Sequence, residues 1–330
     1  MRVLYVGGTG EISLSCVRES VKLNHEVVVF NRGRDEQPLP QGVRRIVGDL
    51  SNDEAYRALR AESFDVVCQF LAFDRPIIER DLEVFGGRIG QYVFISTASA
   101  YAKPLDLFSA ITEDTPLANP FWEYSQKKAR MEQALLEWHG QGRLPVTIVR
   151  PSHTYDRNFP VAIGGGDWTA ERMLAGRPVI VHGDGSSLWT LTHSSDFARP
   201  FARLLGSAGA LGAAFHITGA GVHTWNEILV TMARALGREA HLVHVASDTL
   251  VRYEPSWTGP LHGDKAPSTV FDNRKVRSVV GDFEISVSLR AGFEGVVPHF
   301  FERRKARGTA SDPRLDTLAD RIIREHAAPI

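Results

Sequence analysis

The sequence has little cysteine and no long hydrophobic run. Cys16 and Cys68 are its only cysteines among 330 residues, so their number excludes a disulfide framework and an all-cysteine metal site. Both lie in apolar segments, and we expect them to pack in the core. No apolar run approaches the roughly 20 residues of a membrane-spanning helix, which excludes a membrane as the expected partner.

An excess of charge of either sign is also absent. The 38 basic and 39 acidic residues give a net charge of -1, so charge offers no argument for nucleic acid or an anionic membrane. The basic run 303–305 is interpreted as a solvated helix end, and nucleic acid is not an expected partner. No His, Asp or Glu cluster has the spacing of metal ligands, so we expect no metal. The chain begins directly with a predicted strand at 2–6, which predicts no signal peptide and a cytoplasmic protein.

Strand and helix patterns alternate through the first half of the chain. Short apolar strands are predicted at 3–6, 26–30, 44–47, 65–71, 91–96 and 146–149, and helices between them include 11–23 and 120–138. Asn119 is the expected cap of the second helix. This order predicts an α/β fold with a doubly wound parallel sheet of Rossmann type. After residue 150 the pattern loosens, and we expect a core of residues 1–155 and a smaller C-terminal substrate lobe of residues 156–330, with segments near 190–220 returning to the core.

A glycine turn follows the first predicted strand. Gly7, Gly8, Thr9 and Gly10 lie between that strand and a helix, where glycine lets the backbone approach a pyrophosphate closely. The start of the helix offers N–H groups to the anion. At the position where the usual pattern has its last glycine, this sequence has Ser13. That position serves helix–strand packing, and serine is small enough for it. The turn predicts a dinucleotide site.

The end of the second strand indicates which dinucleotide. NAD-binding proteins usually carry an acidic residue there for the ribose hydroxyl. Here Asn31 is followed by Arg32 and Arg34, and guanidinium groups suit a 2′-phosphate. We therefore expect NADP(H) to be favoured over NAD(H).

Tyr124 and Lys128 are candidates for proton transfer. They are four residues apart in a predicted helix and so share one face. A nearby lysine is expected to lower the pKa of the phenol, which could then exchange a proton with a substrate oxygen. Thr97, at the end of the fifth strand, could hydrogen-bond the same oxygen.

With these motifs in order, the sequence resembles the extended short-chain dehydrogenase/reductase family, which includes nucleotide-sugar epimerases and dehydratases. The matching segments are residues 7–12, 48–50, 96–101, 124–128, 149–151 and 182–185. The resemblance implies that Tyr124 is the general acid/base, that Lys128 binds the nicotinamide ribose and that Thr97 is the assisting hydroxyl. It also allows for a homodimer.

The resemblance further implies which residues surround the ligands. Cofactor contacts are expected from Gly7, Thr9, Gly10, Glu11, Ile12, Asn31, Arg32, Arg34, Asp49, Leu50, Leu71, Ala72, Phe73, Pro151 and Ser152. A small-molecule substrate is expected to border Ser99, Tyr101, His153 and Trp189.

Departures from the family pattern bear on the substrate. Ala98 and Ser99 stand where dehydratases carry an Asp-Glu pair, so the acid/base pair for eliminating water is missing. Trp189 and His262 stand where arginines grip a nucleotide diphosphate, and His153 replaces an asparagine. A diphosphate would lack its bidentate partners there. These changes favour a more apolar or aromatic pocket.

The leading hypothesis is an NADP(H)-dependent, ketoreductase-like oxidoreductase that transfers hydride between nicotinamide and a carbonyl or alcohol carbon. The alternatives are a nucleotide-sugar epimerase or 4-ketoreductase, and a non-catalytic cofactor-sensing or RNA-associated member of the family. The substrate, its stereochemistry and the direction of reaction stay open at the level of sequence.

Overall fold

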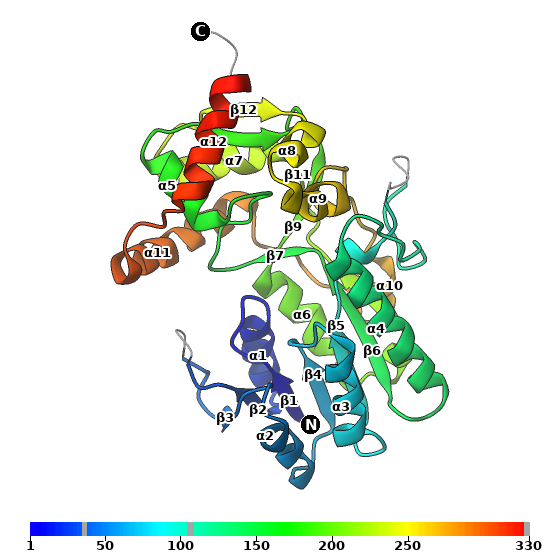
Figure 1. The fold of residues 1–330 in the computed structure, drawn as a ribbon. Helices are drawn as coiled ribbons and strands as arrows, with labels where there is room; N and C mark the ends of the chain where they lie inside the picture. The colour runs from blue at the N-terminus through cyan, green and yellow to red at the C-terminus, as the bar shows by residue number, and fades with distance from the viewer. Residues whose placement is uncertain (35–37, 104–108, 327–330) are drawn as a thin grey trace.

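A seven-stranded parallel sheet forms the centre of the larger lobe in the computed structural model, which describes residues 1–34, 38–103 and 109–326 (Figure 1). The strand order is β10-β6-β5-β4-β1-β2-β3. This order confirms the predicted Rossmann-type α/β fold. The bounds are β1 Arg2–Val6, β2 Glu26–Asn31, β3 Arg44–Val47, β4 Val66–Gln69, β5 Gln91–Ile95, β6 Val146–Pro151 and β10 Ala214–Ile217.

The strands β4, β5 and β6 are buried along their whole length and mostly apolar, because helices cover both faces of the sheet. β1 pairs with β2 on one side and with β4 on the other. The chain therefore leaves β1 and its neighbour β4 in opposite directions along the sheet. Such a switch point opens a crevice at the carboxyl ends of the strands, where α/β proteins bind ligands.

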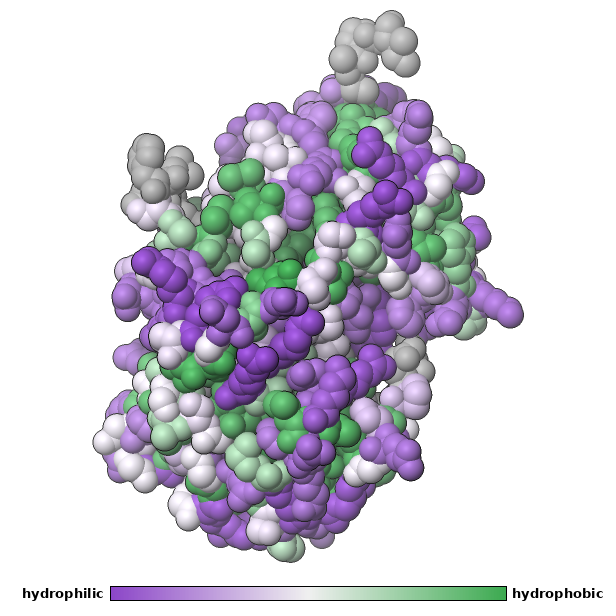
Figure 2. All heavy atoms as spheres, turned by 180° about the vertical axis from the view of Figure 1, so that it is seen from behind, coloured by the Kyte–Doolittle hydropathy of each residue, from purple (hydrophilic) through white to green (hydrophobic). Residues whose placement is uncertain are grey.

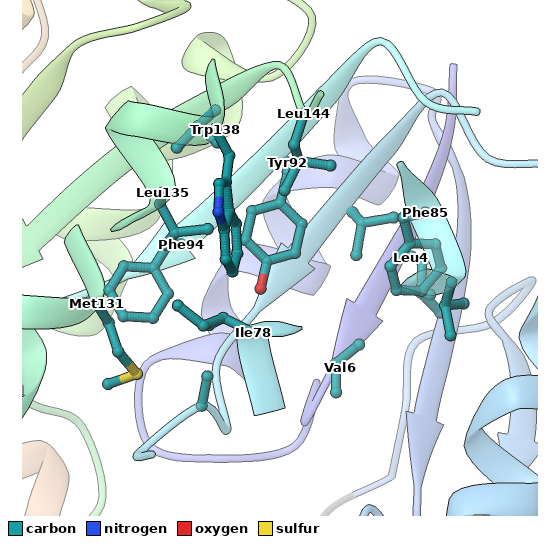
Figure 3. Packing of buried hydrophobic residues seen from close by; sticks show 14 of the residues in the cluster. Leu4, Val6, Ile78, Phe85, Tyr92, Phe94, Met131, Leu135, Trp138 and Leu144 are labelled. Atoms are coloured by element: carbon teal, nitrogen blue, oxygen red, sulfur yellow. The ribbon is translucent and has the colours of Figure 1, made fainter. Parts of the chain in front are cut away.

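Two hydrophobic layers hold the helices to the sheet. On one face, α2 Asp53–Arg57, α3 Arg75–Phe85 and α4 Glu123–Gly140 cover the strands. Figure 3 shows Ile78 of α3 and Trp138 of α4 packed around Tyr92 and Phe94 of β5. On the other face, α1 Ser13–Lys22 and α6 Ser194–Leu204 pack together, with α10 Arg274–Val280 beside them.

The smaller lobe carries most of the remaining elements (Figure 1). β8 Val179–His182 pairs in parallel with β12 Leu242–Val245. β9 Leu188–His193 pairs with β7 His153–Tyr155 and β11 Val222–Thr224. Its helices are α5 Gly166–Leu174, α7 Trp225–Ala235, α8 Ser247–Tyr253, α9 Thr258–Pro260, α11 Leu289–Arg307 and α12 Pro313–His326.

The chain passes between the lobes more than once. After β9 it returns to the sheet through α6 and β10, and it returns again through α10 before ending in α11 and α12 (Figure 1). The assignment of 1–155 and 156–330 to separate domains stays a prediction. No helix in the described ranges is long and apolar enough to cross a membrane. Seen from behind, both lobes carry interspersed hydrophilic and hydrophobic side chains (Figure 2).

Helix α4 begins later than the sequence indicates. Its N-cap is Trp122, whose side chain makes no capping bond. The expected cap, Asn119, instead donates from Nδ2 to the carbonyl oxygens of Ser99, at 2.6 Å, and Gly263, at 2.5 Å. The capping role predicted for Asn119 is therefore wrong, because the side chain links two distant segments.

We expect Arg150→Met to lower the free energy of unfolding by about 3–5 kcal/mol, because it would leave the buried Glu132 carboxylate unpaired. Arg150 reaches Glu132 through Nε at 3.1 Å and Nη2 at 2.6 Å, and both side chains are buried. Urea unfolding followed by circular dichroism measures the loss. Arg290→Met breaks the exposed pair with Glu294 and should cost less than about 1 kcal/mol. Equal losses in the two variants would contradict this interpretation.

Candidate active site

The glycine turn between β1 and α1 is shaped by close contacts. Gly7 has φ +87°, and a Cβ there would lie 2.5 Å from Leu71 Cγ. A Cβ on Gly8 would lie 2.7 Å from Val29 Cγ2. The Ser13 hydroxyl donates to Gly7 O at 2.5 Å and accepts from Gly10 N–H at 2.9 Å. A serine at the third position of the motif therefore fastens the turn by hydrogen bonds.

A cavity of about 1060 Å³ opens beside this turn, at the carboxyl ends of the strands. Its volume suits a dinucleotide-sized ligand, and the absence of side chains at the turn leaves room for a pyrophosphate. Ten of the predicted cofactor residues line it: Gly7, Thr9, Gly10, Asn31, Arg32, Arg34, Asp49, Leu50, Leu71 and Phe73. Five others, all described, lie outside its wall: Glu11, Ile12, Ala72, Pro151 and Ser152.

Glu11 is engaged within the chain. Its Oε1 accepts from the backbone N–H groups of Asp156, Arg157 and Asn158 at 2.8, 2.7 and 2.9 Å. The carboxylate therefore ties the glycine turn to the segment that follows β7. The Ser152 hydroxyl likewise bonds within the chain, to Thr192 Oγ1 at 2.9 Å.

Arg157 is a wall residue that the sequence analysis missed. It lines the cavity, and its Nη2 donates to Thr9 O at 3.4 Å. It therefore brings a positive charge to the glycine turn. No local motif marks it, since Arg157 lies 148 residues from Thr9.

The basic turn after β2 faces the same cavity. Asn31 Oδ1 accepts from Gly33 N–H at 3.0 Å, and Nδ2 donates to Thr9 Oγ1 at 3.3 Å. Hydrogen bonds from Ser51 lower the pKa of Asp49, and Arg32 and Arg34 lower it further. Both arginines thus lie close enough to act on the cavity electrostatically.

Lys128 is buried between the ends of two strands. Its Nζ donates to Ala72 O at 2.8 Å and to Ile95 O at 2.7 Å. The Nζ lies 4.9 Å from the centre of the Phe73 ring and 6.0 Å from that of Tyr124. Burial lowers the pKa of Lys128 to about 7.

Burial raises the pKa of Tyr124, and a smaller effect of the Thr97 hydroxyl lowers it. The net lowering of this pKa that was expected from Lys128 is therefore absent. The hydroxyl of Thr97 bonds Ser99 Oγ at 2.9 Å, and Ser99 Oγ bonds Ser125 Oγ at 2.7 Å. The hydroxyls of Thr97, Ser99 and Ser125 thus form one network, and Thr97 lies near enough to Tyr124 to act on its pKa. A phenol held protonated in this way is suited to donating a proton.

His153 and Trp189 meet on the side of the smaller lobe. Trp189 Nε1 donates to His153 Nδ1 at 3.2 Å, so the other ring nitrogen of a neutral imidazole carries the proton. Burial lowers the pKa of His153 well below its usual value. His153 also lines a second cavity of about 330 Å³, whose wall includes Phe159, Trp257 and Pro260.

One expectation about the substrate side, that of Tyr101, differs from the structure. Tyr101 is fully buried, and its hydroxyl contacts His216 Nδ1 at 3.0 Å and Arg150 Nη1 at 3.1 Å. It therefore points into the core, away from Tyr124. His262, at the position of an expected arginine, pairs with Asp248 at 3.2 Å.

Trp122 and Lys265 are further neighbours that the sequence analysis missed. The Trp122 ring lies 5.2 Å from the Tyr124 ring, and Lys265 Nζ lies 5.6 Å from the Trp122 ring. A Cβ on Gly259 would lie 2.4 Å from Trp122 Cδ1, so glycine lets the segment before Lys265 approach. Within residues 1–34, 38–103 and 109–326, no three His, Cys, Asp or Glu side chains gather as a metal site needs.

Known proteins share this arrangement of sequence and fold. The profile of the NAD dependent epimerase/dehydratase family matches residues 77–217. The 2′-dehydrokanamycin reductase of Streptomyces kanamyceticus is 30% identical over 253 residues, which are 75% of this chain and 70% of that protein. The chloroplast stem-loop binding protein of 41 kDa b of Arabidopsis thaliana is 30% identical over 261 residues, 74% of this chain and 65% of that protein.

Solved structures share the fold at lower identity. UDP-glucuronic acid 4-epimerase from Bacillus cereus, solved with UDP-glucuronic acid and NAD, aligns with a TM-score of 0.72 and 19% identity over 92% of this chain and 99% of that one. UDP-glucose 4-epimerase from Thermus thermophilus, solved with NAD, aligns with a TM-score of 0.69 and 21% identity over 91% and 99%.

The buried ammonium of Lys128 predicts a pH dependence of stability. Its folded pKa of about 7 lies below the usual 10.5, so the unfolded chain binds its proton more tightly. Between those values the free energy of unfolding should rise with pH, by at most about 1.4 kcal/mol per unit. The free energy of unfolding, measured with urea at pH 7 to 9, should rise less steeply with pH for Lys128→Met than for the unsubstituted chain. Identical slopes would show that Lys128 does not titrate in this range.

Proposed function

This chain belongs to the NAD-dependent epimerase/dehydratase family, and on that premise we propose that it is an NADP(H)-dependent carbonyl reductase with Tyr124 as proton donor. The observation that carries the proposal is the placement of Tyr124 beside the buried Lys128, whose Nζ lies 6.0 Å from the centre of the Tyr124 ring. The Tyr124 ring also lies 6.5 Å from the ring of Phe73, which lines the dinucleotide-sized cavity.

Each residue of the set has a distinct task. When bound, the nicotinamide supplies the hydride. The Tyr124 hydroxyl gives its proton to the carbonyl oxygen of the substrate, and Thr97 hydrogen-bonds the same oxygen and orients it. Burial raises the pKa of Tyr124, so the phenol is protonated at neutral pH, as reduction requires. Lys128 is held by two backbone carbonyls and presents its charge where it assists that transfer.

The cofactor preference rests on the turn after β2. Arg32 and Arg34 line the cavity, and Asn31 occupies the place where a carboxylate would receive a ribose hydroxyl. Guanidinium groups bind a phosphate by charge-assisted hydrogen bonds. These residues favour NADP(H) over NAD(H). Arg157 adds a positive charge near the pyrophosphate.

One of the two relatives with 30% identity described above is named a reductase, which supports a reductase over an epimerase. The dehydratase pair is replaced by Ala98 and Ser99, so elimination of water lacks its acid and base. An epimerase would return the hydride to the same molecule, and net consumption of NADPH therefore separates the two activities.

Tyr124→Phe should lower kcat for NADPH oxidation by about 10²–10⁴-fold, because the variant keeps the ring but has no proton to give. The measurement uses a panel of carbonyl compounds that includes nucleotide-linked keto-sugars and apolar ketones. Tyr253→Phe, which removes a hydroxyl bonded to Glu325 on the smaller lobe, is the control and should retain full activity. Unchanged turnover of Tyr124→Phe would overturn the assigned mechanism.

Arg32→Ser and Arg34→Ser should each weaken NADPH binding by about 10–100-fold, since each removes a charged hydrogen bond of about 1.5–3 kcal/mol. Fluorescence titration should show NADH binding nearly unchanged in both variants. Arg18→Ser, an exposed position on α1, is the matched control and should alter neither affinity. If the unsubstituted chain binds NADH more tightly than NADPH, the assignment of a 2′-phosphate site is wrong.

A further inference from the structure

Lys103 is a buried cation that nothing in the proposed reduction uses. It is 6% exposed, and among the residues that the structure describes its Nζ has no hydrogen-bond partner. A buried ammonium without a partner is costly. A lysine with a purely structural role would be expected to bond a carbonyl or a carboxylate, as Lys128 does.

Lys265 brings a second cation to the same place. Its Nζ pairs with Asp264 at 2.9 Å and lies 5.8 Å from the Trp189 ring. Asp264 and Lys265 both act on Lys103, since burial lowers the pKa of Lys103, Asp264 raises it and Lys265 lowers it further. The three side chains therefore lie within electrostatic reach of one another, with two cations to one carboxylate.

The Asp264–Lys265 pair lies near the Tyr124 phenol. Asp264 also raises the pKa of Tyr124, so the carboxylate is within electrostatic reach of the phenol. Asn119 holds the segment before Asp264 in place by bonding both Gly263 O and Ser99 O. Lys265 Nζ lies 5.6 Å from the Trp122 ring, which itself lies 5.2 Å from the Tyr124 ring, so this cation is near the phenol.

Lys265 also lies on the side of the second cavity, because its Nζ is 5.8 Å from the ring of Trp189, which bonds His153. Lys265 lowers the pKa of His153, and His153 lines the cavity of about 330 Å³ whose wall includes Phe159, Trp257 and Pro260. A ligand that extends from Tyr124 past the two lysines would therefore place its remainder against apolar and aromatic side chains.

We propose that Lys103 and Lys265 form an oxyanion subsite, and that the substrate carries a carboxylate or a phosphate close to its reacting carbonyl carbon. The subsite would pair the Lys103 ammonium, which the described chain leaves without a hydrogen bond, and would share the Lys265 ammonium with Asp264. That the anion belongs to the substrate rests on the proposed function, whereas the anion site itself does not.

Kinetics on matched carbonyl pairs tests the substrate class. Benzoylformate and its methyl ester differ in one carboxylate charge, and dihydroxyacetone phosphate and dihydroxyacetone differ in one phosphate. With NADPH, kcat/KM should be at least about 10-fold higher for the charged member than for the neutral member in at least one of the two pairs. Lys103→Met and Lys265→Met should remove that preference, because kcat/KM should fall at least about 10-fold more for the charged member than for the neutral member. Lys103→Arg should restore part of it, and Lys22→Met, an exposed position on α1, should change neither value.

Calorimetry separates failure of the subsite from failure of the proposed reduction. Benzoate, phenyl phosphate and benzamide are titrated into the chain loaded with NADP⁺. At least one anion should bind 10-fold or more tightly than benzamide, and either lysine-to-methionine variant should lose that difference. If no carbonyl compound is reduced but this pattern holds, the subsite stands and the proposed reductase activity fails. If carbonyl compounds are reduced while charged and neutral members behave alike in every variant, the subsite is overturned.

Thermal unfolding shows whether each variant is folded. If Lys103→Met is not, Lys265→Met carries the test alone. Lys265 has its own carboxylate partner, and its loss should still reduce anion binding. Anion binding that is unchanged in a folded Lys265→Met variant would overturn the paired subsite.

Discussion

The buried ammonium of Lys128 constrains the whole catalytic edge of the sheet. Its two hydrogen bonds go to Ala72 O and Ile95 O, which are the backbone carbonyls that follow β4 and close β5. Because the charge is buried, losing either bond would leave it poorly solvated. The two strand ends and α4 are therefore held at a fixed separation. Tyr124, one turn earlier on the helix, is thereby held beside Thr97, and Phe73 is held across the ammonium.

The three buried lysines differ in the number of partners that their ammonium groups have within the chain. Lys128 has two carbonyl partners, Lys265 has one carboxylate partner, and Lys103 has no hydrogen-bond partner within the described residues. Lys128 and Lys265 lie near Tyr124. The ammonium group of Lys128 has its partners within the chain. The ammonium group of Lys103 would gain one from a bound anion, as proposed. Burial alone therefore does not mark a functional cation, and the number of partners it has within the chain is the informative property.

The sequence predicted what is encoded locally. The alternation of apolar strands and helices predicted a doubly wound Rossmann-type sheet, which is confirmed, and the spacing of Tyr124 and Lys128 predicted that both lie on one helix. Contacts between distant segments could not be predicted from the sequence. Asn119 resembled a helix cap but bonds Gly263, 144 residues away, and no motif marks the bonds of the Glu11 carboxylate to the backbone of residues 156–158. Lys103 and Arg157 had no motif at all, because their roles arise only when the lobes come together.

The proposed anion subsite would separate this chain from relatives that grip a nucleotide diphosphate. Trp189 and His262 occupy the two positions where arginines would grip that group. Trp189 is committed to His153 and His262 to Asp248, so neither position supplies a free cation. Positive charge comes instead from Lys103 and Lys265, which share Asp264 with the surroundings of Tyr124. An anion bound there would lie near the reacting carbon rather than at the far end of a nucleotide. The same fold would then recognise a charge next to the reacting carbonyl, in place of a diphosphate far from it, because its cations stand at different positions.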